Sequence, residues 1–480
     1  MNDAPLWSGL GLVAALDARV SGTPPLGGVT GVSIDTRSLK PGELYVAIRG
    51  DLHDGHDFVA QAFAAGAAAA VVDEAHAPGL RRSLGDLPCL YVVEDALRAL
   101  ERLGAAARAR SKARVVAVTG SVGKTTVKEM LRLVLSDAGP THASAASFNN
   151  HWGVPLTLAR LPAEARYGVF EVGMNHPGEI TPLVALVRPD IAVVTTVAAA
   201  HLEHFASVDE IADAKAEIFS GLVQGGLAVI NRDIDTYGRL RAAAEASPAG
   251  RILTFGEHPE ADARLESFAP TPDGVEARAR VLGRRVDFRL GAPGRHLAVN
   301  ALAVLLAAHA AGLDLDGAAD PLARFTVGQG RGARVTLRLP GGDATLIDES
   351  YNANPTSMRA ALAVLAAAAP AGEGRRVAVI GDMRELGTDA ERLHAELLPD
   401  LEAARVDLVF AAGPLSHALF SRLPAEMRGL WGDTAAAIEG PLADGIRAGD
   451  VVMVKGSNGS RMGPLVAALK DRFRPTPAGR

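Results

Sequence analysis

The sequence offers almost no material for disulfide bonds or thiolate metal clusters. Cys89 is the only cysteine among 480 residues, which fits a reducing compartment and excludes a disulfide framework. The formal net charge is -6, so the chain has no excess of positive charge with which to bind nucleic acid. Aromatic residues make up only 4% of the chain.

Long apolar runs are also missing. The longest, residues 297–313, is interrupted by Asn300 and His309, whereas a bilayer span needs about 20 predominantly apolar residues. The first eight residues, M-N-D-A-P-L-W-S, lack the basic and apolar segments of a signal peptide. We therefore expect a cytoplasmic protein with no membrane span and no nucleic-acid partner, and we expect a monomer.

Length and composition predict several globular domains of the α/β class. A chain of 480 residues, 48% hydrophobic and 22% charged, is too long for a single core. Short strands rich in Val and Ile alternate with amphipathic helices, a pattern typical of parallel sheets covered on both faces. We expect a small α/β domain at 1–88, a central parallel-sheet domain at 89–318 and a Rossmann-like domain at 319–480. The expected strands are 32–34, 44–48, 69–72, 115–119, 168–172, 191–197, 227–230, 252–255, 344–347, 377–380, 408–411 and 451–454.

Residues 115–126, V-V-A-V-T-G-S-V-G-K-T-T, join an apolar strand to a glycine turn and the start of a helix. Backbone N–H groups at a helix start face phosphates, and Lys124 adds a full positive charge. A threonine directly after the lysine is placed to bind Mg²⁺. Val118 stands where the full Walker A pattern has glycine, and an ordinary strand–helix turn is the alternative. We predict a nucleoside triphosphate site, followed by a helix whose buried face is Val127, Met130, Leu131, Val134 and Leu135.

Polar residues follow the other predicted strands, where ligands gather in open α/β sheets. Glu171 ends the second central strand. Across the crevice from a P-loop threonine, its carboxylate can complete a Mg²⁺ shell; a solvated carboxylate is the alternative. His201 fits a hard-metal or phosphate contact or a structural histidine. A zinc site is not expected, because His201 and His204 are only three residues apart and no third strong ligand follows at metalloprotease spacing.

Lys215 occupies a position that is patterned for burial. The segment 207–210, S-V-D-E, is a capping box that starts a helix, and Ile211, Lys215, Ile218 and Leu222 form one stripe along it. Burial lowers the pKa of a lysine, and a neutral amine can react with CO₂ to give a carbamate that holds Mg²⁺. The alternative is a lysine that extends from the edge of the stripe into solvent.

Three further loops combine acids, hydroxyls, amides and lysine at predicted strand ends. They are D-E-S-Y-N-A-N-P at 348–355, G-D-M-R-E-L-G at 381–387 and K-G-S-N-G-S at 455–460. Such loops have the character of anion- or peptide-binding segments, although Asn352 and Asn354 could also be simple turn formers.

These motifs, read together, resemble the Mur ligase family over nearly the whole chain. In order, the segments are S-I-D-T-R, D-G-H-D-F, T-G-S-V-G-K-T-T, F-N-N-H-W-G-V-P-L-T-L, E-V-G-M-N-H-P-G-E-I, A-A-A-H-L-E-H-F, A-K-A-E-I-F, P-G-R-H-L-A-V-N-A, S-Y-N-A-N-P, G-D-M-R-E-L-G and V-K-G-S. The resemblance implies an ATP- and Mg²⁺-dependent, ADP-forming ligase of peptidoglycan synthesis. Its expected reaction joins D-alanyl-D-alanine to UDP-N-acetylmuramoyl-tripeptide through an acyl phosphate.

The resemblance also implies roles for individual residues. The metal ligands would be Thr125, Glu171, His201 and carbamylated Lys215, which with Lys124 make up the catalytic set. The ATP site would comprise Gly120, Ser121, Val122, Gly123, Lys124, Thr125, Thr126, His296, Asn300, Arg331 and Asp348, with Asp348 on the ribose. The substrates would contact Ser33, Asp35, Thr36, Arg37, Asn149, Asn150, Asn352, Asn354 and Lys455.

Other functions remain open on the sequence alone. A sibling ligase or a folylpolyglutamate synthetase, each adding a single amino acid, would keep the central motifs but change the acceptor loops. A non-catalytic protein that binds a nucleotide or a cell-wall precursor would not need Glu171, His201 and Lys215 together. The Y-N-A-N-P segment at 351–355 favours the dipeptide-adding ligase.

Overall fold

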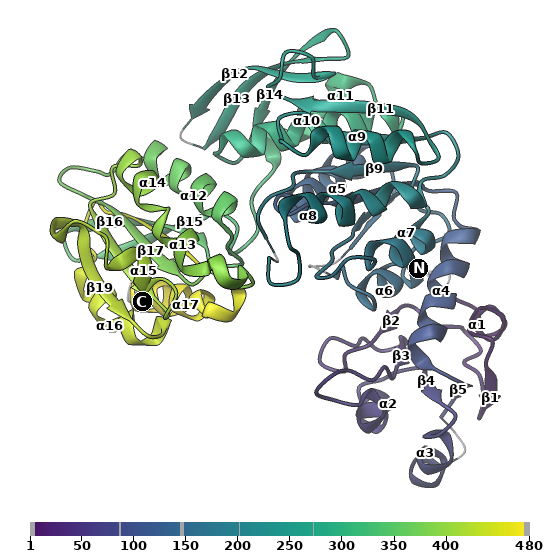
Figure 1. Ribbon diagram of the computed structural model, residues 1–480. Helices are drawn as coiled ribbons and strands as arrows, with labels where there is room; N and C mark the ends of the chain where they lie inside the picture. The colour runs from purple at the N-terminus through teal and green to yellow at the C-terminus, as the bar shows by residue number, and fades with distance from the viewer. Residues whose placement is uncertain (1–4, 86–87, 145–147, 201, 272, 475–480) are drawn as a thin grey trace, which may run out of the picture.

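The computed structural model describes residues 5–85, 88–144, 148–200, 202–271 and 273–474, which form three units, each built on its own sheet. The central unit lies between the other two along the chain (Figure 1). In that view the N-terminal unit lies below it and the C-terminal unit to its left. Within the described part of the chain, no helix is both long and apolar enough to cross a bilayer.

The N-terminal unit contains a five-stranded sheet in the order β1-β5-β4-β3-β2. β1 is antiparallel to β5, and the other pairs are parallel. β5 belongs to this sheet although it follows the predicted boundary at residue 88. The elements are α1 (Gly9–Leu16), β1 (Arg19–Ser21), β2 (Val32–Ser33), β3 (Leu44–Val46), α2 (Val59–Ala64), β4 (Ala69–Asp73), α3 (Ala77–Leu84), β5 (Leu90–Val93) and α4 (Ala96–Arg110).

The N-terminal and central units share one hydrophobic core. Trp7 is buried at their junction, where its indole N–H donates to Ala159 O at 2.9 Å. The Arg110 guanidinium lies 3.6 Å from the centre of the Trp7 ring, and Arg160 Nε donates to Val32 O at 2.6 Å. These contacts attach the first unit firmly to the second.

The central unit contains a nine-stranded sheet in the order β14-β13-β12-β11-β10-β9-β6-β8-β7. The predicted parallel sheet is confirmed from β7 to β12, but β12, β13 and β14 pair antiparallel, an extension that was not predicted from the sequence. The strands are β6 (Arg114–Thr119), β7 (Thr141–Ala143), β8 (Tyr167–Glu171), β9 (Ile191–Val194), β10 (Gly226–Asn231), β11 (Ala249–Gly256), β12 (Ala263–Thr271), β13 (Gly274–Val281) and β14 (Arg284–Leu290).

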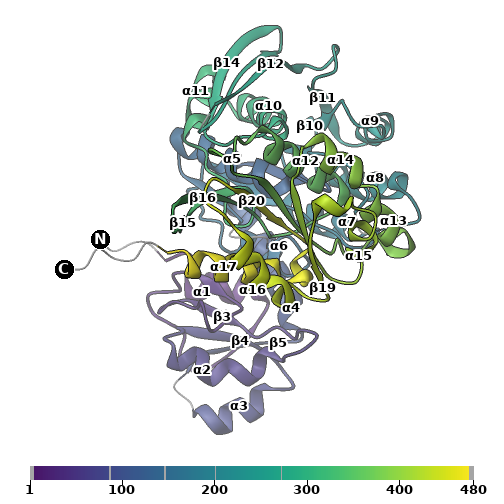
Figure 2. The same ribbon diagram turned by 90° about the vertical axis from the view of Figure 1, so that its left-hand side faces the viewer.

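Helices cover both faces of this central sheet (Figure 2). α5 and α10 share one hydrophobic cluster with it, and α6 to α9 share the cluster on the other side. The predicted buried face of α5 is confirmed, because its five apolar residues are fully buried. The helices are α5 (Lys124–Ala138), α6 (Gly153–Ala159), α7 (Ile180–Val187), α8 (Val208–Ala216), α9 (Tyr237–Glu245), α10 (Arg295–Ala310) and α11 (Leu315–Ala319).

The C-terminal unit is a six-stranded sheet in the order β15-β16-β20-β17-β18-β19, parallel except for β15. Separate apolar clusters cover its two faces, which confirms the predicted Rossmann-like arrangement. The elements are β15 (Ala333–Leu339), β16 (Gly342–Glu349), α12 (Pro355–Ala367), β17 (Arg376–Gly381), α13 (Ala390–Ala395), α14 (Leu398–Ala403), β18 (Leu408–Ala412), α15 (His417–Phe420), β19 (Arg428–Gly432), α16 (Ala435–Gly445), β20 (Val451–Lys455) and α17 (Met462–Arg472).

The central and C-terminal units are joined by the connecting chain and also by a contact between the segments around Leu202 and Glu385. Leu202 packs against the apolar clusters of both units. Next to it, Glu203 N donates to Glu385 O at 3.3 Å. The carboxyl ends of the two parallel sheets therefore meet across one cleft.

Candidate active site

The loop between β6 and α5 has a backbone shape that requires glycine. Gly120 and Gly123 have φ values of 149° and 90°, in the region where side chains cause strain. A Cβ on Gly120 would lie 2.0 Å from Thr195 Oγ1 at the end of β9. The loop leads directly into the N-terminus of α5, which is the geometry of an anion site.

Lys124 begins α5 and turns back toward this loop. Its Nζ donates to Gly120 O at 2.6 Å. Burial lowers the pKa of Lys124, the neighbouring Glu171 carboxylate opposes this effect, and Arg331 adds a further lowering. A partly buried lysine stands at the helix start, where its ammonium group can meet the charge of a phosphate.

Glu171, at the end of β8, is hydrogen-bonded to two other predicted site residues. Its Oε2 accepts a hydrogen bond from Thr125 Oγ1 at 2.8 Å, and its Oε1 accepts one from Asn149 Nδ2 at 2.7 Å. The side chain is buried, so the alternative of a solvated carboxylate is wrong. The hydroxyl and carboxylate oxygens of Thr125 and Glu171 are donors that suit a hard cation such as Mg²⁺.

Most of the predicted site residues line a single cavity of about 360 Å³ between the central and C-terminal units. Residues from the phosphate loop, from the Asn149 segment and from the C-terminal loops share its wall. The predicted residues among its lining are Ser121, Val122, Gly123, Lys124, Thr125, Thr126, Asn149, Asn150, Glu171, His296, Asn300, Arg331, Asn352, Asn354 and Lys455. We call it the phosphate cavity.

Asp348 does not line the phosphate cavity, contrary to its expected contact with the ribose. Its side chain is buried, where Oδ2 accepts from Lys470 Nζ at 3.0 Å and Oδ1 accepts from Ser350 Oγ at 2.6 Å. Successive side chains of a strand point to opposite faces, and the next residue, Glu349, lines the cavity instead. Lys455 Nζ lies 3.2 Å from Glu349 Oε2.

A second cavity of about 540 Å³ adjoins the first and is more apolar. The two share Val122, His296 and Asn300. Burial lowers the pKa of His296, which favours the neutral imidazole. Phe268 and Pro270, both from β12, complete the wall with α12. The mainly apolar lining, with a few polar groups, suits an aromatic heterocycle, so we call this the base cavity.

Phe268 and Pro270 were not predicted as site residues, because β12 was not recognised in the sequence. These residues have no motif around them, and only the antiparallel extension of the sheet brings them to the base cavity. The alternation of apolar and charged residues along β13 and β14, as in V-E-A-R-A-R-V at 275–281, was the sequence signal that could have revealed the extension.

Lys215 lies in α8 and is 2% exposed, so the burial predicted from periodicity is confirmed. Burial holds the pKa of Lys215 well below its ordinary value, and the charge of Lys124 lowers it further. Lys215 is not among the described residues that line the phosphate cavity. His201, the other predicted metal ligand from this region, lies outside the described residues.

The predicted substrate residues of the N-terminal unit lie away from both cavities, at the end of β2 and in the turn that follows it. Asp35 accepts a bidentate ion pair from Arg37, with a shortest distance of 2.6 Å. The Arg37 guanidinium lowers the pKa of Asp35. Ser33 Oγ donates to Asp35 O at 3.1 Å, and Thr36 lies between the charged pair in sequence. Arg37 is largely exposed and available to a ligand.

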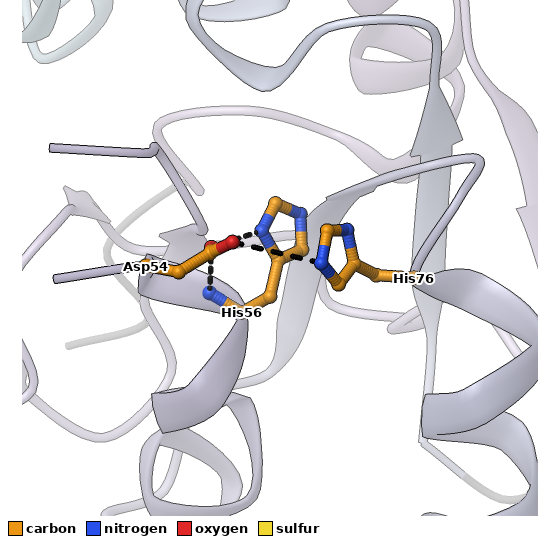
Figure 3. Close-up of side chains that lie close together, drawn as sticks. All are labelled: Asp54, His56 and His76. Atoms are coloured by element: carbon orange, nitrogen blue, oxygen red, sulfur yellow. Dashed lines mark hydrogen bonds and ion pairs between the residues drawn. The ribbon is translucent and has the colours of Figure 1, made fainter.

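A cluster that was not predicted from the sequence lies in the same unit and contains Asp54, His56 and His76 (Figure 3). His56 Nε2 accepts the backbone N–H of Asp73 at 3.0 Å, so its Nδ1 carries the proton that it shares with Asp54 at 2.6 Å. No lone pair of His56 remains for a metal ion, and Arg49 lies 3.2 Å from Asp73. The cluster is therefore a hydrogen-bonded support for the loop before α2.

A third cavity, of about 540 Å³, lies at the carboxyl ends of β17, β18 and β19. Its wall contains side chains of both signs. The positive ones are Arg384 and Arg461, and the negative ones are Asp382, Asp433 and Glu439. Mixed charges of this kind suit a zwitterionic ligand. We call it the C-terminal cavity.

Comparison with known proteins gives matches over most of the chain. Family models match at residues 28–108 (Mur ligase family, catalytic domain), 118–308 (Mur ligase middle domain) and 330–458 (Mur ligase, glutamate ligase domain). The chain is similar to the UDP-N-acetylmuramoyl-tripeptide–D-alanyl-D-alanine ligase of Escherichia coli, with 38% identity over 92% of this chain and 93% of the relative.

Two solved structures share this architecture. The crystal structure of MurF from Acinetobacter baumannii has a TM-score of 0.82 and 30% identity, covering 97% of this chain and 99% of that one. MurF ligase from Thermotoga maritima in complex with ADP has a TM-score of 0.75 and 26% identity, covering 92% and 97% of the two chains.

Proposed function

The chain belongs to the Mur ligase family, and we infer that it is an ATP-dependent ligase joining D-alanyl-D-alanine to UDP-N-acetylmuramoyl-tripeptide. The observation that carries this function is the phosphate cavity, in which Lys124, Thr125 and Glu171 face the Y-N-A-N-P loop and Lys455 of the C-terminal unit. The reaction forms ADP and phosphate and belongs to peptidoglycan precursor synthesis. Its need for ATP and for a nucleotide-linked precursor supports a cytoplasmic location.

The three units divide the ligands between them. Residues 1–88 bind the uridine nucleotide through Ser33, Asp35, Thr36 and Arg37. Residues 89–318 bind ATP, and residues 319–480 bind the acceptor. This division is supported by the separate positions of the exposed Arg37 turn, the phosphate and base cavities, and the C-terminal cavity.

Within the ATP site, the phosphates lie on the loop 120–126 and against Arg331. The adenine enters the base cavity, where the amide of Asn300 and the neutral imidazole of His296 offer hydrogen bonds. Glu349, and not Asp348, contacts the ribose, because Glu349 lines the phosphate cavity whereas Asp348 is paired with Lys470.

The first chemical step activates the substrate carboxylate. One carboxylate oxygen attacks the γ-phosphorus, the bond from phosphorus to the β–γ bridging oxygen breaks, and ADP leaves with that electron pair. Lys124 neutralises charge on the transferred phosphoryl group. Asn149 and Asn150, which line the phosphate cavity beside Glu171, orient the peptide end.

In the second step the amine of the dipeptide attacks the acyl carbon. A C–N bond forms, a tetrahedral intermediate collapses, and the C–O bond to phosphate breaks while the amine loses a proton. Asn352, Asn354 and Lys455 face this region. The acceptor lies toward the C-terminal cavity, where Arg384 and Arg461 suit its carboxylate. No side-chain nucleophile is needed.

The oxygen donors of this site fit Mg²⁺. Thr125, Glu171 and His201 would hold it, and the bound ion would neutralise charge on the phosphates and the acyl phosphate. Lys215 would be a further anionic ligand if its neutral amine adds CO₂, with release of one proton, to form a carbamate. The lowered pKa of Lys215 supports this modification, because the neutral amine is the reactive form.

The function is tested by measuring phosphate release with UDP-muramoyl-tripeptide, with and without D-alanyl-D-alanine. We expect sustained release only when ATP, the tripeptide precursor and the dipeptide are all present, with one ligated product for each phosphate. Equal release without the dipeptide, or nucleotide binding without any ligation, would refute the ligase assignment.

A further inference from the structure

Lys128 is a fully buried lysine that the proposed reaction does not use. It lies one turn after Lys124 on α5. Lysines are almost never fully buried unless they are paired. Its Nζ donates to Ser144 O at 2.8 Å and lies 2.7 Å from Glu129 Oε1. The ammonium group therefore joins the P-loop helix to the residue that follows β7.

Ser144 in turn binds the strand that ends in Glu171. Its backbone N–H donates to Val169 O at 3.1 Å, and its Oγ accepts the backbone N–H of Glu171 at 3.2 Å. Three polar groups of one buried serine are thus engaged, two with β8 and one with Lys128. Movement of Ser144 would displace the backbone of Glu171.

The side chain of Glu171 is connected to the same helix at another point. Thr125 Oγ1 donates to its Oε2, so α5 contacts Glu171 directly through Thr125 and indirectly through Lys128 and Ser144. Together these contacts form a closed ring of interactions around the carboxylate.

The charge of Lys128 is balanced from the solvent side. Glu129 bridges Lys128 and Arg132, at 2.7 Å from each. Burial would raise the pKa of Glu129, but the hydrogen bonds from these two cations outweigh that effect and lower it. Glu129 therefore stays ionised, and loss of Lys128 leaves it paired with Arg132.

We propose that Lys128 is a positioning residue for Glu171, which it holds, through Ser144, in the geometry needed to bind a divalent cation. This inference rests on the proposed role of Glu171 as a Mg²⁺ ligand. Mg²⁺ demands near-ideal octahedral geometry, so small shifts of a ligand are costly. Residues that hydrogen-bond to the ligands of a metal ion commonly contribute about 10–100-fold to metal affinity or activity.

The test measures ADP affinity of the full chain by titration calorimetry, with Mg²⁺ and without it. In Lys128→Met we expect the gain in affinity that Mg²⁺ provides to fall by about tenfold, while affinity for metal-free ADP is unchanged. The matched control is Arg132→Met, which removes the other, exposed partner of Glu129 and should keep the full gain. An undiminished gain in Lys128→Met overturns the proposal.

Two further variants keep the outcome decisive. Glu171→Gln tests the metal site itself: if it retains the Mg²⁺ gain, the proposed role of Glu171 is wrong. If Glu171→Gln loses the gain and Lys128→Met keeps it, only the role of Lys128 is wrong. Should Lys128→Met fail to fold, Ser144→Ala, which removes the acceptor for the Glu171 N–H, decides by the same measurement: a reduced gain supports the proposal, and a full gain overturns it.

Discussion

Lys124 is the residue whose positive charge the proposed phosphoryl transfer depends on most. Its pKa is lowered by burial, but the Glu171 carboxylate opposes that effect and favours the charged form. A partly buried cation next to a phosphate interacts with it more strongly than one in water, because less solvent screens the two charges.

Lys124→Ala should lower kcat by roughly 10²–10³-fold, the usual effect of removing one donor that stabilises a transition state. The backbone of the loop would remain, so ADP should still bind. Lys112→Ala, at an exposed lysine just before β6, is the control and should keep full activity. Steady-state phosphate release measures kcat of both variants, and a thermal melt shows whether each is folded. Near-normal turnover in Lys124→Ala would refute the P-loop assignment.

Lys215 offers a sharper test, because its proposed role requires chemistry that other residues cannot supply. Lys215→Ala should lose most activity, and Lys215→Arg should fail as well, since a guanidinium keeps its charge and does not take up CO₂. Added acetate should partly restore Lys215→Ala by supplying an anionic oxygen near the metal ligands. Restoration by a small amine, or an active Lys215→Arg, would show that the residue acts as a cation.

The lowered pKa of Lys215 also makes stability depend on pH. In the unfolded chain its pKa has the ordinary value of 10.5, whereas burial holds the folded value well below this. Between the two values the unfolded state binds more protons, so the stability contributed by this group rises with pH. In CO₂-free buffer, Lys215→Met should therefore melt above the wild type at neutral pH, and the difference should shrink toward pH 10.5. A difference independent of pH would contradict the lowered pKa.

At the scale of elements, the turn between β6 and α5 depends on backbone conformation as much as on charge. Gly120 has a φ of 149°, and a Cβ there would meet Thr195 Oγ1 at 2.0 Å. That hydroxyl also donates to Val122 O at 2.6 Å, so a side chain at position 120 would disturb the contact between the loop and the end of β9.

Gly120→Ala should cost about 1–3 kcal/mol in the free energy of unfolding, the usual cost of a strained backbone position, and should weaken ADP binding. Gly238→Ala is the control, because this glycine lies within α9 and a Cβ on it would meet only open space, so alanine there should be neutral or slightly stabilising. Denaturant melts and nucleotide titration measure the two effects. Normal ADP affinity in Gly120→Ala would show that the loop does not hold the phosphates.

At the scale of the whole molecule, the reaction needs ligands from three units to meet. The first unit shares a core with the central unit, whereas the C-terminal unit contacts it through the connecting chain and the Leu202–Glu385 region. We expect the C-terminal unit to close over the phosphate cavity when substrates bind, since such closure excludes water and completes a site.

Acceptor selectivity should follow from this arrangement. A site whose charged groups match both ends of a dipeptide leaves some of them unpaired with a single amino acid. D-Alanyl-D-alanine should therefore exceed free D-alanine by roughly 100-fold or more in kcat/KM. Comparable kcat/KM values for single amino acids would identify a sibling ligase instead.

Much of this protein follows from local sequence, and the reason is that the signals concerned are local. The strand, glycine turn and helix start at 115–126, the buried face of α5 and the burial of Lys215 depend on residues that are close in sequence, and all three are confirmed. The principal parallel strands are equally local, as short runs of Val and Ile. Resemblance to a family then connects these local segments to a reaction.

Other features were decided only by tertiary structure, because they depend on which segments meet. Strand register turns Asp348 into the core and Glu349 into the phosphate cavity, although both are acids in the same motif. The antiparallel extension brings Phe268 to the base cavity from a segment without a motif. Lys128 looks like an ordinary helix lysine in the sequence, and only the packing of α5 against the end of β7 gives it Ser144 as a partner. A local pattern can at most indicate a strand, as the alternation along β13 and β14 does; which strands pair and which side chains enter a cavity are set by the assembled sheet.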